Sequence, residues 1–229
     1  MSLLPALELS THATPDASIL WLHGLGADGH DFVPVVKELQ LPDTLRLRFI
    51  FPHAPLQAVT INNGLVMRAW YDIRFNGLQR ETDDAGVLRS VAAVNALVER
   101  ETSRGIATSR ILLAGFSQGG AVVLTAGTRY PETLGGILAL STYLPLAEQL
   151  TQHASTANQH IPIFMAHGTQ DNVIPLSLAE TSRQALTQAG YPVQWQAYPM
   201  AHHLCQEEIE AISRWIQTVL TDDRPTSHP

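Results

Sequence analysis

A G-x-S-x-G sequence at residues 115–119 constrains the fold of this chain more than any other feature. It follows the apolar run 111–114 and precedes a segment, 120–127, that can wind as a helix. A strand, a glycine-flanked serine and a helix, in that order, are typical of a nucleophile elbow, which exposes the serine hydroxyl at the top of a sheet. Glycine on both sides removes the β-carbons that would collide in so sharp a turn. The sequence therefore predicts that Ser117 is a nucleophile.

Apolar runs alternate along the chain with segments whose apolar residues recur at helical spacing. This alternation predicts an α/β fold with a mostly parallel central sheet and helices on both faces. The expected strands are residues 18–22, 45–51, 111–115, 136–140, 161–166 and 193–198. The expected helices outside the elbow are residues 31–39, 86–101, 176–189 and 207–220.

Residues 1–229 are expected to form a single domain, because no Ser/Gly/Pro-rich linker or run of charges divides the chain. The segment 53–85 is long, shows little periodicity, and contains proline, asparagine and glycine. Loops of that length in a compact domain are usually functional or disordered, so we interpret this one as a lid-like insertion. The polar tail 221–229 is expected to fray.

The charge and cysteine content exclude several classes of function and location. The net charge is −7 and the only lysine is Lys37, which argues against nucleic acid and against anionic membranes as partners. The single cysteine, Cys205, rules out an internal disulfide and fits a reducing compartment. Residues 1–10 lack the basic region of a signal peptide, and no stretch approaches the roughly 18 apolar residues that span a bilayer. We therefore expect a cytoplasmic protein without a stable membrane anchor.

Ser117 needs a base to take its proton and a carboxylate to orient that base. In this kind of fold the chain order is serine, acid, histidine, and reactive residues follow the carboxyl ends of the strands. Asp171 is the only aspartate between Ser117 and the last expected helix, and it follows the strand at 161–166. We predict that it is the acid, although a loop aspartate here could also cap the next helix.

The base must be a histidine downstream of the nucleophile. His153 and His160 lie in or beside the polar stretch 152–159, and His228 lies in the tail. His167 is too near Asp171 in the chain to come from a separate loop. The remaining pair, His202 and His203, follows the strand that ends at residue 198. Adjacent side chains point in different directions, so only one of the two can serve.

An acyl-transfer site also needs N–H donors for the developing oxyanion. The residue after the nucleophile supplies one donor, which here is the N–H of Gln118. The second is expected from the glycine-containing loop 23–29, as the N–H of Leu25, although this loop could be an ordinary turn between strand and helix. Phosphate-binding glycine motifs are absent from it.

With these residues identified, the chain resembles the phospholipase/carboxylesterase family of α/β-hydrolases, which includes small bacterial carboxylesterases and acyl-protein thioesterases. The resemblance runs from about residue 19 to residue 220 and implies an α/β-hydrolase fold. It rests on the blocks Leu22-His23-Gly24-Leu25-Gly26, Ala69-Trp70-Tyr71-Asp72-Ile73, Gly115-Phe116-Ser117-Gln118-Gly119-Gly120, His167-Gly168 with Asp171, and Tyr198-Pro199-Met200-Ala201-His202.

The family pattern implies a role for each matching residue. Its catalytic histidine follows a methionine and one small residue, which selects His202 over His203, and its acid falls on Asp171. Its oxyanion donors fall on Leu25 and Gln118. The chain departs from the pattern mildly at Ala201, where glycine is common, and in having a second histidine after the catalytic position.

The resemblance also implies an acyl chain bound in an apolar groove near the Trp-Tyr-Asp block. The expected groove residues are Leu65, Met67, Trp70, Val173 and Ile174, with core packing as the alternative for Trp70. No cofactor is expected, and no metal, since the chain has no Cys/His cluster with metal-ligand spacing. Homodimers in the family make a homodimer plausible here.

These features predict a serine carboxylesterase that hydrolyses short- to medium-chain acyl esters through a Ser-His-Asp triad and an acyl-enzyme. An acyl-protein thioesterase or lysophospholipase acting on long acyl chains is the alternative within the same chemistry. A non-catalytic binding module on the same fold is the remote alternative.

Overall fold

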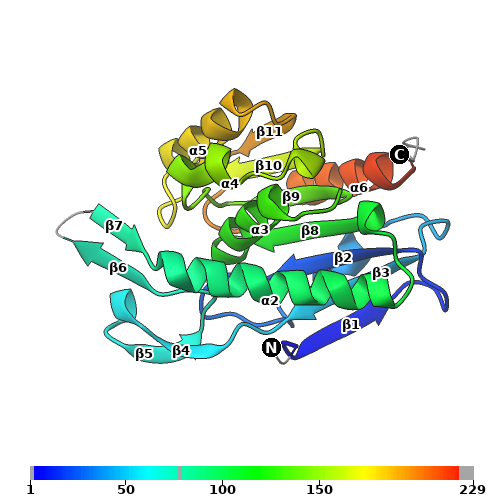
Figure 1. The fold of residues 1–229 in the computed structure, drawn as a ribbon, viewed down its shortest axis with the longest axis horizontal. Helices are drawn as coiled ribbons and strands as arrows, with labels where there is room; N and C mark the ends of the chain where they lie inside the picture. The colour runs from blue at the N-terminus through cyan, green and yellow to red at the C-terminus, as the bar shows by residue number, and fades with distance from the viewer. Residues whose placement is uncertain (1–2, 77–78, 222–229) are drawn as a thin grey trace.

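The computed structural model describes residues 3–76 and 79–221, and it is built around a seven-stranded sheet with the order β1-β3-β2-β8-β9-β10-β11 (Figure 1). The pairing of β1 with β3 is antiparallel, and all the other pairs in this sheet are parallel. The strands are β1 (Ala6–Ser10), β2 (Ala17–Leu22), β3 (Leu47–Pro52), β8 (Ile111–Phe116), β9 (Gly136–Leu140), β10 (Ile163–Gly168) and β11 (Val193–Tyr198).

Helices cover both faces of this sheet. They are α1 (Val33–Glu38), α2 (Asp84–Ser103), α3 (Gln118–Arg129), α4 (Leu150–His153), α5 (Leu176–Gln188) and α6 (Gln206–Thr221). The mostly parallel sheet with helices on both faces confirms the predicted α/β-hydrolase architecture. In the part of the chain that the structure describes, no helix is long and apolar enough to cross a membrane.

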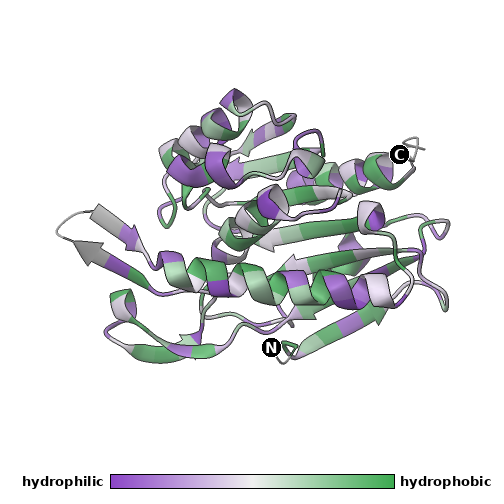
Figure 2. Cartoon of the chain, in the orientation of Figure 1, coloured by the Kyte–Doolittle hydropathy of each residue, from purple (hydrophilic) through white to green (hydrophobic). Residues whose placement is uncertain are grey.

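Two apolar cores lie on opposite faces of the sheet, because successive side chains of a strand point to opposite sides. In β2, Leu20 and Leu22 belong to the core beneath α2 and α3, whereas Ile19 and Trp21 belong to the core beneath α6. In Figure 2 the inner strands of the central sheet are mainly hydrophobic, whereas α2 mixes hydrophobic and hydrophilic residues. The inner strands of the sheet are therefore buried on both faces, and the residues at their ends are left for chemistry.

The strands of the parallel sheet occur where the apolar runs predict them, but β1 was not expected. Its sequence, residues 6–10, has only five residues and alternates between half-buried and exposed positions at the sheet edge. Such a short segment carries too weak a periodic signal to be identified from sequence.

The insertion at 53–85 is more regular than the expected loop. It forms one hairpin from β4 (Leu56–Val59) and β5 (Leu65–Arg68) and a second from β6 (Ile73–Asn76) and β7 (Gln79–Thr82). Both hairpins lie on the left in Figure 1, at the end of the molecule where the parallel strands finish.

A single carboxylate ties the two hairpins together. Asp72 accepts hydrogen bonds from the N–H of Thr60 at 2.8 Å, from the Thr60 hydroxyl at 2.6 Å, and from the N–H of Ile73 at 2.9 Å. The predicted frayed tail, except for Thr221 at the end of α6, lies outside the described residues.

Candidate active site

Ser117 occupies a strained turn between β8 and α3. Its backbone has φ 54° and ψ −120°, a conformation that a residue with a β-carbon rarely adopts. The turn is held from β9, because the Ser117 N–H donates to the carbonyl of Leu140 at 2.9 Å and the Thr142 hydroxyl donates to the Ser117 carbonyl at 2.6 Å. A β-carbon at Gly119 would overlap the backbone oxygens of Leu22 and His23. The glycine of the motif thus lets α3 begin directly against the end of β2.

The three residues predicted to form the triad come together at this turn. His202 Nε2 lies 2.9 Å from Ser117 Oγ, and His202 Nδ1 lies 2.6 Å from Asp171 Oδ2. Ser117 follows β8, Asp171 follows β10, and His202 follows β11, so the carboxyl ends of parallel strands deliver all three. Ser117 is 8% exposed, so the nucleophile is largely buried.

Asp171 is held as an ionised carboxylate. Burial by itself would raise its pKa, but hydrogen bonds from His202 and from the N–H groups of Ile174 and Val173 outweigh burial and lower the pKa. Both N–H groups donate to Oδ1 at 2.8 Å, which leaves Oδ2 for the imidazole. A carboxylate fixed in this way can orient His202 and stabilise its imidazolium.

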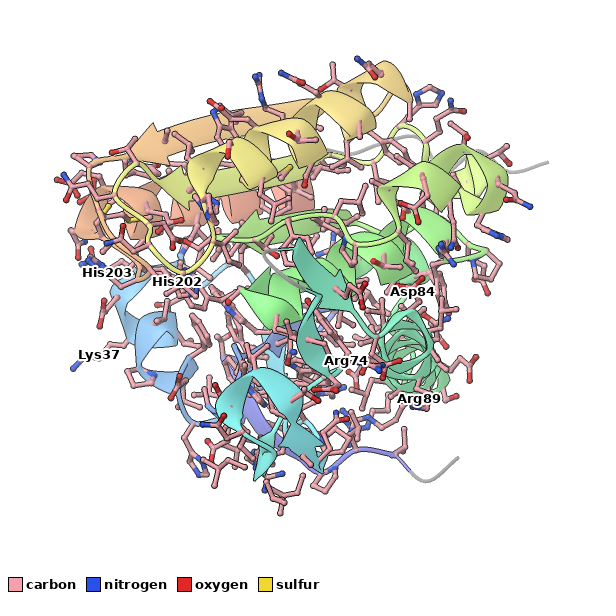
Figure 3. All side chains as sticks on the ribbon, turned by 90° about the vertical axis from the view of Figure 1, so that its left-hand side faces the viewer. Lys37, Arg74, Asp84, Arg89, His202 and His203 are labelled. Atoms are coloured by element: carbon pink, nitrogen blue, oxygen red, sulfur yellow. The ribbon has the colours of Figure 1, made fainter. Side chains whose placement is uncertain are left out.

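The loop after β11 places His202, and not His203, over the serine. Close backbone contact with the end of β10 sets this loop, since a β-carbon on Gly168 would meet the carbonyl oxygen of Ala201 at 2.5 Å. The ring of Phe116 also contacts the His202 ring, with the ring centroids 4.7 Å apart. His203 is exposed and donates from Nδ1 to the carbonyl of Leu204 at 2.9 Å. Figure 3 looks onto this face of the molecule, where both histidines are labelled.

Of the two predicted oxyanion donors, Gln118 is the first residue of α3 and Leu25 lies in the loop after β2. Among the described residues, the N–H groups of Leu25 and Gln118 donate to no protein acceptor. The loop of Leu25 passes close to the nucleophile, because a β-carbon on Gly24 would lie 3.4 Å from Ser117 Cβ. Both N–H groups thus lack a partner among the described residues, and their role as oxyanion donors stays a prediction.

The five residues predicted to line an acyl groove divide into two groups. Trp70 and Ile174 are 2% and 1% exposed, so they offer almost no surface to an acyl chain. Trp70 packs in the core, which is the alternative expected for it, and its indole N–H donates to the carbonyl of His23 at 2.8 Å. Leu65 and Val173 are 62% and 58% exposed, and Met67 is half-buried beside the loop of Leu25. The groove itself stays a prediction.

Sequence reasoning missed a second histidine that supports the acid loop. His167 is buried, and its Nε2 donates to the carbonyl of Ile174 at 2.9 Å while lying 3.4 Å from Asp171 Oδ2. Burial lowers the pKa of His167, which keeps the ring neutral. The His-Gly pair at 167–168 is the signal in the sequence, but it does not reveal which carbonyl the ring would contact.

One side-chain cluster outside the triad has the composition of a metal site. Asp28, His30 and His53 bring one potential ligand atom each to within 4.8 Å of one another. His53 Nδ1 accepts the N–H of Gly29 at 3.1 Å, and burial lowers the pKa of His53, so the neutral ring carries its proton on Nε2. Neither nitrogen of His53 then has a free lone pair, and we assign no metal to this cluster.

Comparison with known proteins gives a consistent family. The family model described as Phospholipase/Carboxylesterase matches residues 9–220. An acyl-protein thioesterase 1 of Yarrowia lipolytica is 36% identical over 218 residues, covering 93% of this chain and 96% of the relative. An acyl-protein thioesterase 1 of Neurospora crassa is 38% identical over 221 residues, covering 93% of this chain and 90% of the relative.

Solved structures agree with these sequence matches. The crystal structure of Arabidopsis thaliana SOBER1 superposes with a TM-score of 0.84 at 32% identity, covering 90% of this chain and 99% of that one. A curated sequence from the same plant, Carboxylesterase SOBER1, is 32% identical over 211 residues, which is 91% of this chain and 92% of the relative. Named relatives thus include both esterases and thioesterases.

Proposed function

Since this chain belongs to the phospholipase/carboxylesterase family of α/β-hydrolases and is a serine hydrolase, we propose that it hydrolyses short- to medium-chain acyl esters. The observation that supports ester hydrolysis is the continuous contact from Ser117 through His202 to Asp171, at 2.9 Å and 2.6 Å, and the chain-length preference is left to the substrate series below. A cytoplasmic location and a homodimer stay predictions.

In the proposed acylation step, Ser117 Oγ attacks the carbonyl carbon while His202 Nε2 takes the hydroxyl proton. The electron pair of the carbonyl moves to its oxygen, which accepts hydrogen bonds from the N–H groups of Leu25 and Gln118. When the tetrahedral intermediate collapses, His202 returns the proton to the leaving alcohol or thiol. Asp171 stabilises the imidazolium throughout, which its lowered pKa favours.

Deacylation uses the same groups with water as the nucleophile. His202 removes a proton from water, the resulting hydroxide attacks the acyl carbon, and the same two N–H groups hold the oxyanion. Collapse expels Ser117 Oγ, which recovers its proton from His202, and the carboxylic acid leaves. The overall course is ping-pong acyl transfer.

Long-chain thioesters or lysophospholipids are the second candidate class. The names of the thioesterase relatives favour this class, and so does a group of apolar side chains on the hairpin β4–β5. Leu65, 62% exposed, lies on the same face of the hairpin as the half-buried Met67, and Leu56 and Val66, 64% and 62% exposed, lie on its other face. A long acyl chain that leaves the serine toward this hairpin would meet apolar surface.

A substrate series separates the two classes. We would measure kcat/KM for p-nitrophenyl acetate, butyrate, octanoate and palmitate, beside palmitoyl and butyryl thioesters. The proposal predicts a maximum at butyrate or octanoate. A steady rise to palmitate, with faster turnover of the palmitoyl thioester, would contradict the short-chain preference and support the second class. Inactivity on every substrate would contradict both.

A further inference from the structure

The direction of the Leu25 N–H is set by the carbonyl group that precedes it. Gly24 C=O and Leu25 N–H belong to one planar peptide unit and point in opposite directions. The carbonyl of Gly24 lies 2.7 Å from His23 Nδ1, and because a carbonyl only accepts, the imidazole donates. His23 Nε2 accepts the N–H of Ala54 at 3.1 Å. The buried ring is thus fixed as one tautomer, and burial lowers its pKa and keeps it neutral.

The preceding peptide unit is held by a second buried ring. The carbonyl of His23 accepts the indole N–H of Trp70 at 2.8 Å, and the two rings lie 5.3 Å apart. Two successive carbonyls of the turn, those of His23 and Gly24, therefore each accept from a buried aromatic side chain. The Gly26 N–H fixes the far end of the turn by donating to the carbonyl of Arg68 at 2.9 Å.

Trp70 is itself anchored to the helix that begins after the nucleophile. The backbone N–H of Trp70 donates to Gln118 Oε1 at 2.7 Å, and Gln118 Nε2 donates to the carbonyl of Tyr71 at 2.7 Å. The hydroxyl of Ser90, on α2, donates to the Trp70 carbonyl. Gln118 is also the residue whose own N–H is the other expected oxyanion donor. One hydrogen-bonded network thus joins both donors through the backbone and the indole of Trp70.

We propose that Trp70 is a positioning residue for the oxyanion hole, which holds the His23–Gly24 peptide so that the Leu25 N–H faces the oxygen formed at Ser117. The inference rests on the proposed function, because an oxyanion exists only if Ser117 attacks an acyl carbon. Donors fixed before the reaction need no reorganisation when charge develops, which is why such networks affect the transition state more than substrate binding.

Two substitutions remove the indole donor while keeping an aromatic side chain. Trp70→Phe keeps an aromatic side chain in the core, and replacement of Trp70 by benzothienylalanine keeps the full bicyclic shape with sulfur in place of N–H. Trp21→Phe is the matched control. Trp21 is equally buried and stacks on Phe32 at 5.3 Å, but its indole N–H has no partner among the described residues.

Steady-state kinetics distinguish a role of Trp70 in positioning the oxyanion hole from a role in core packing alone. With p-nitrophenyl butyrate we expect both Trp70 variants to lose on the order of 10-fold in kcat while KM changes less than about 2-fold, because one indirect hydrogen bond is lost. Trp21→Phe should retain the wild-type kcat. Melting temperatures of all variants show whether the fold is kept.

A transition-state analogue reports the oxyanion directly. An alkyl trifluoromethyl ketone forms a hemiketal with Ser117: the new bond joins Oγ to the carbonyl carbon, the π pair becomes the oxyanion, and the serine proton passes to His202. Its Ki should rise by the same factor as kcat/KM falls. If the benzothienylalanine enzyme is folded and keeps wild-type kcat and Ki, the positioning role is wrong. If the wild-type protein neither turns over esters nor binds the ketone, the proposed function fails instead.

Discussion

Replacing Asp171 by asparagine tests the triad through the tautomer of its histidine. Oδ1 of Asp171 accepts two backbone N–H groups at 2.8 Å, so the amide oxygen of an asparagine must take that position. The NH₂ group then faces His202 Nδ1, where Oδ2 now lies at 2.6 Å. Because an amide NH₂ only donates, Nδ1 must accept and the ring proton moves to Nε2. That nitrogen, 2.9 Å from Ser117 Oγ, can no longer take the serine proton.

The expected loss in kcat for Asp171→Asn is on the order of 10⁴, or about 5 kcal/mol of transition-state stabilisation. The assay is hydrolysis of p-nitrophenyl butyrate at neutral pH, with active-site titration to count folded enzyme. Asp28→Asn is the matched control, because Asp28 also accepts from an imidazole Nδ1, that of His30 at 2.8 Å, outside the triad. A folded Asp171→Asn enzyme with more than about a tenth of wild-type kcat would refute the assignment of the acid.

Two further predictions concern the elbow and a buried carboxyl group. Gly119→Ala should abolish activity or folding, since its β-carbon would overlap the backbone oxygens of Leu22 and His23; an active, folded variant by circular dichroism would contradict this. Burial raises the pKa of Glu208 to about 8, so the folded state keeps a proton that the unfolded state loses above its ordinary pKa near 4.5. The free energy of unfolding should therefore fall by on the order of 3–5 kcal/mol as pH rises from about 5 to about 8. Urea unfolding should show that Glu208→Gln lacks this fall. Parallel pH profiles of the free energy of unfolding for the two proteins would contradict the prediction.

Most of the parallel sheet was predictable because its five inner strands are buried on both faces. Runs such as 111–114 are continuously apolar, which few local structures other than a buried strand require. The hairpins at 56–68 and 73–82 were not predicted, because their strands have only four residues each and residues 65 and 66 are exposed apolar side chains without alternation. The contacts of Asp72 with Thr60 and Ile73, which link the two hairpins, are also not revealed by any local pattern.

Two features allow part of the candidate site to be predicted: the chain order serine, acid, histidine, and the position of these residues after the carboxyl ends of strands. Ser117 and Asp171 follow from that logic alone, whereas His202 and His203 are adjacent and could be separated only by the family pattern. The structure separates them by the backbone contact of Gly168 with the loop. The sequence left open whether Trp70 lines the acyl groove or packs in the core, because its hydrogen-bond partner, the carbonyl of His23, lies 47 residues earlier in the chain.

Labelling with a fluorophosphonate tests most directly whether Ser117 is an activated nucleophile. Intact mass spectrometry of the wild-type protein should show a single adduct, peptide mapping should place it on Ser117, and Ser117→Ala should stay unlabelled. A folded wild-type protein that stays unmodified, or one labelled equally in the Ser117→Ala variant, would contradict the account.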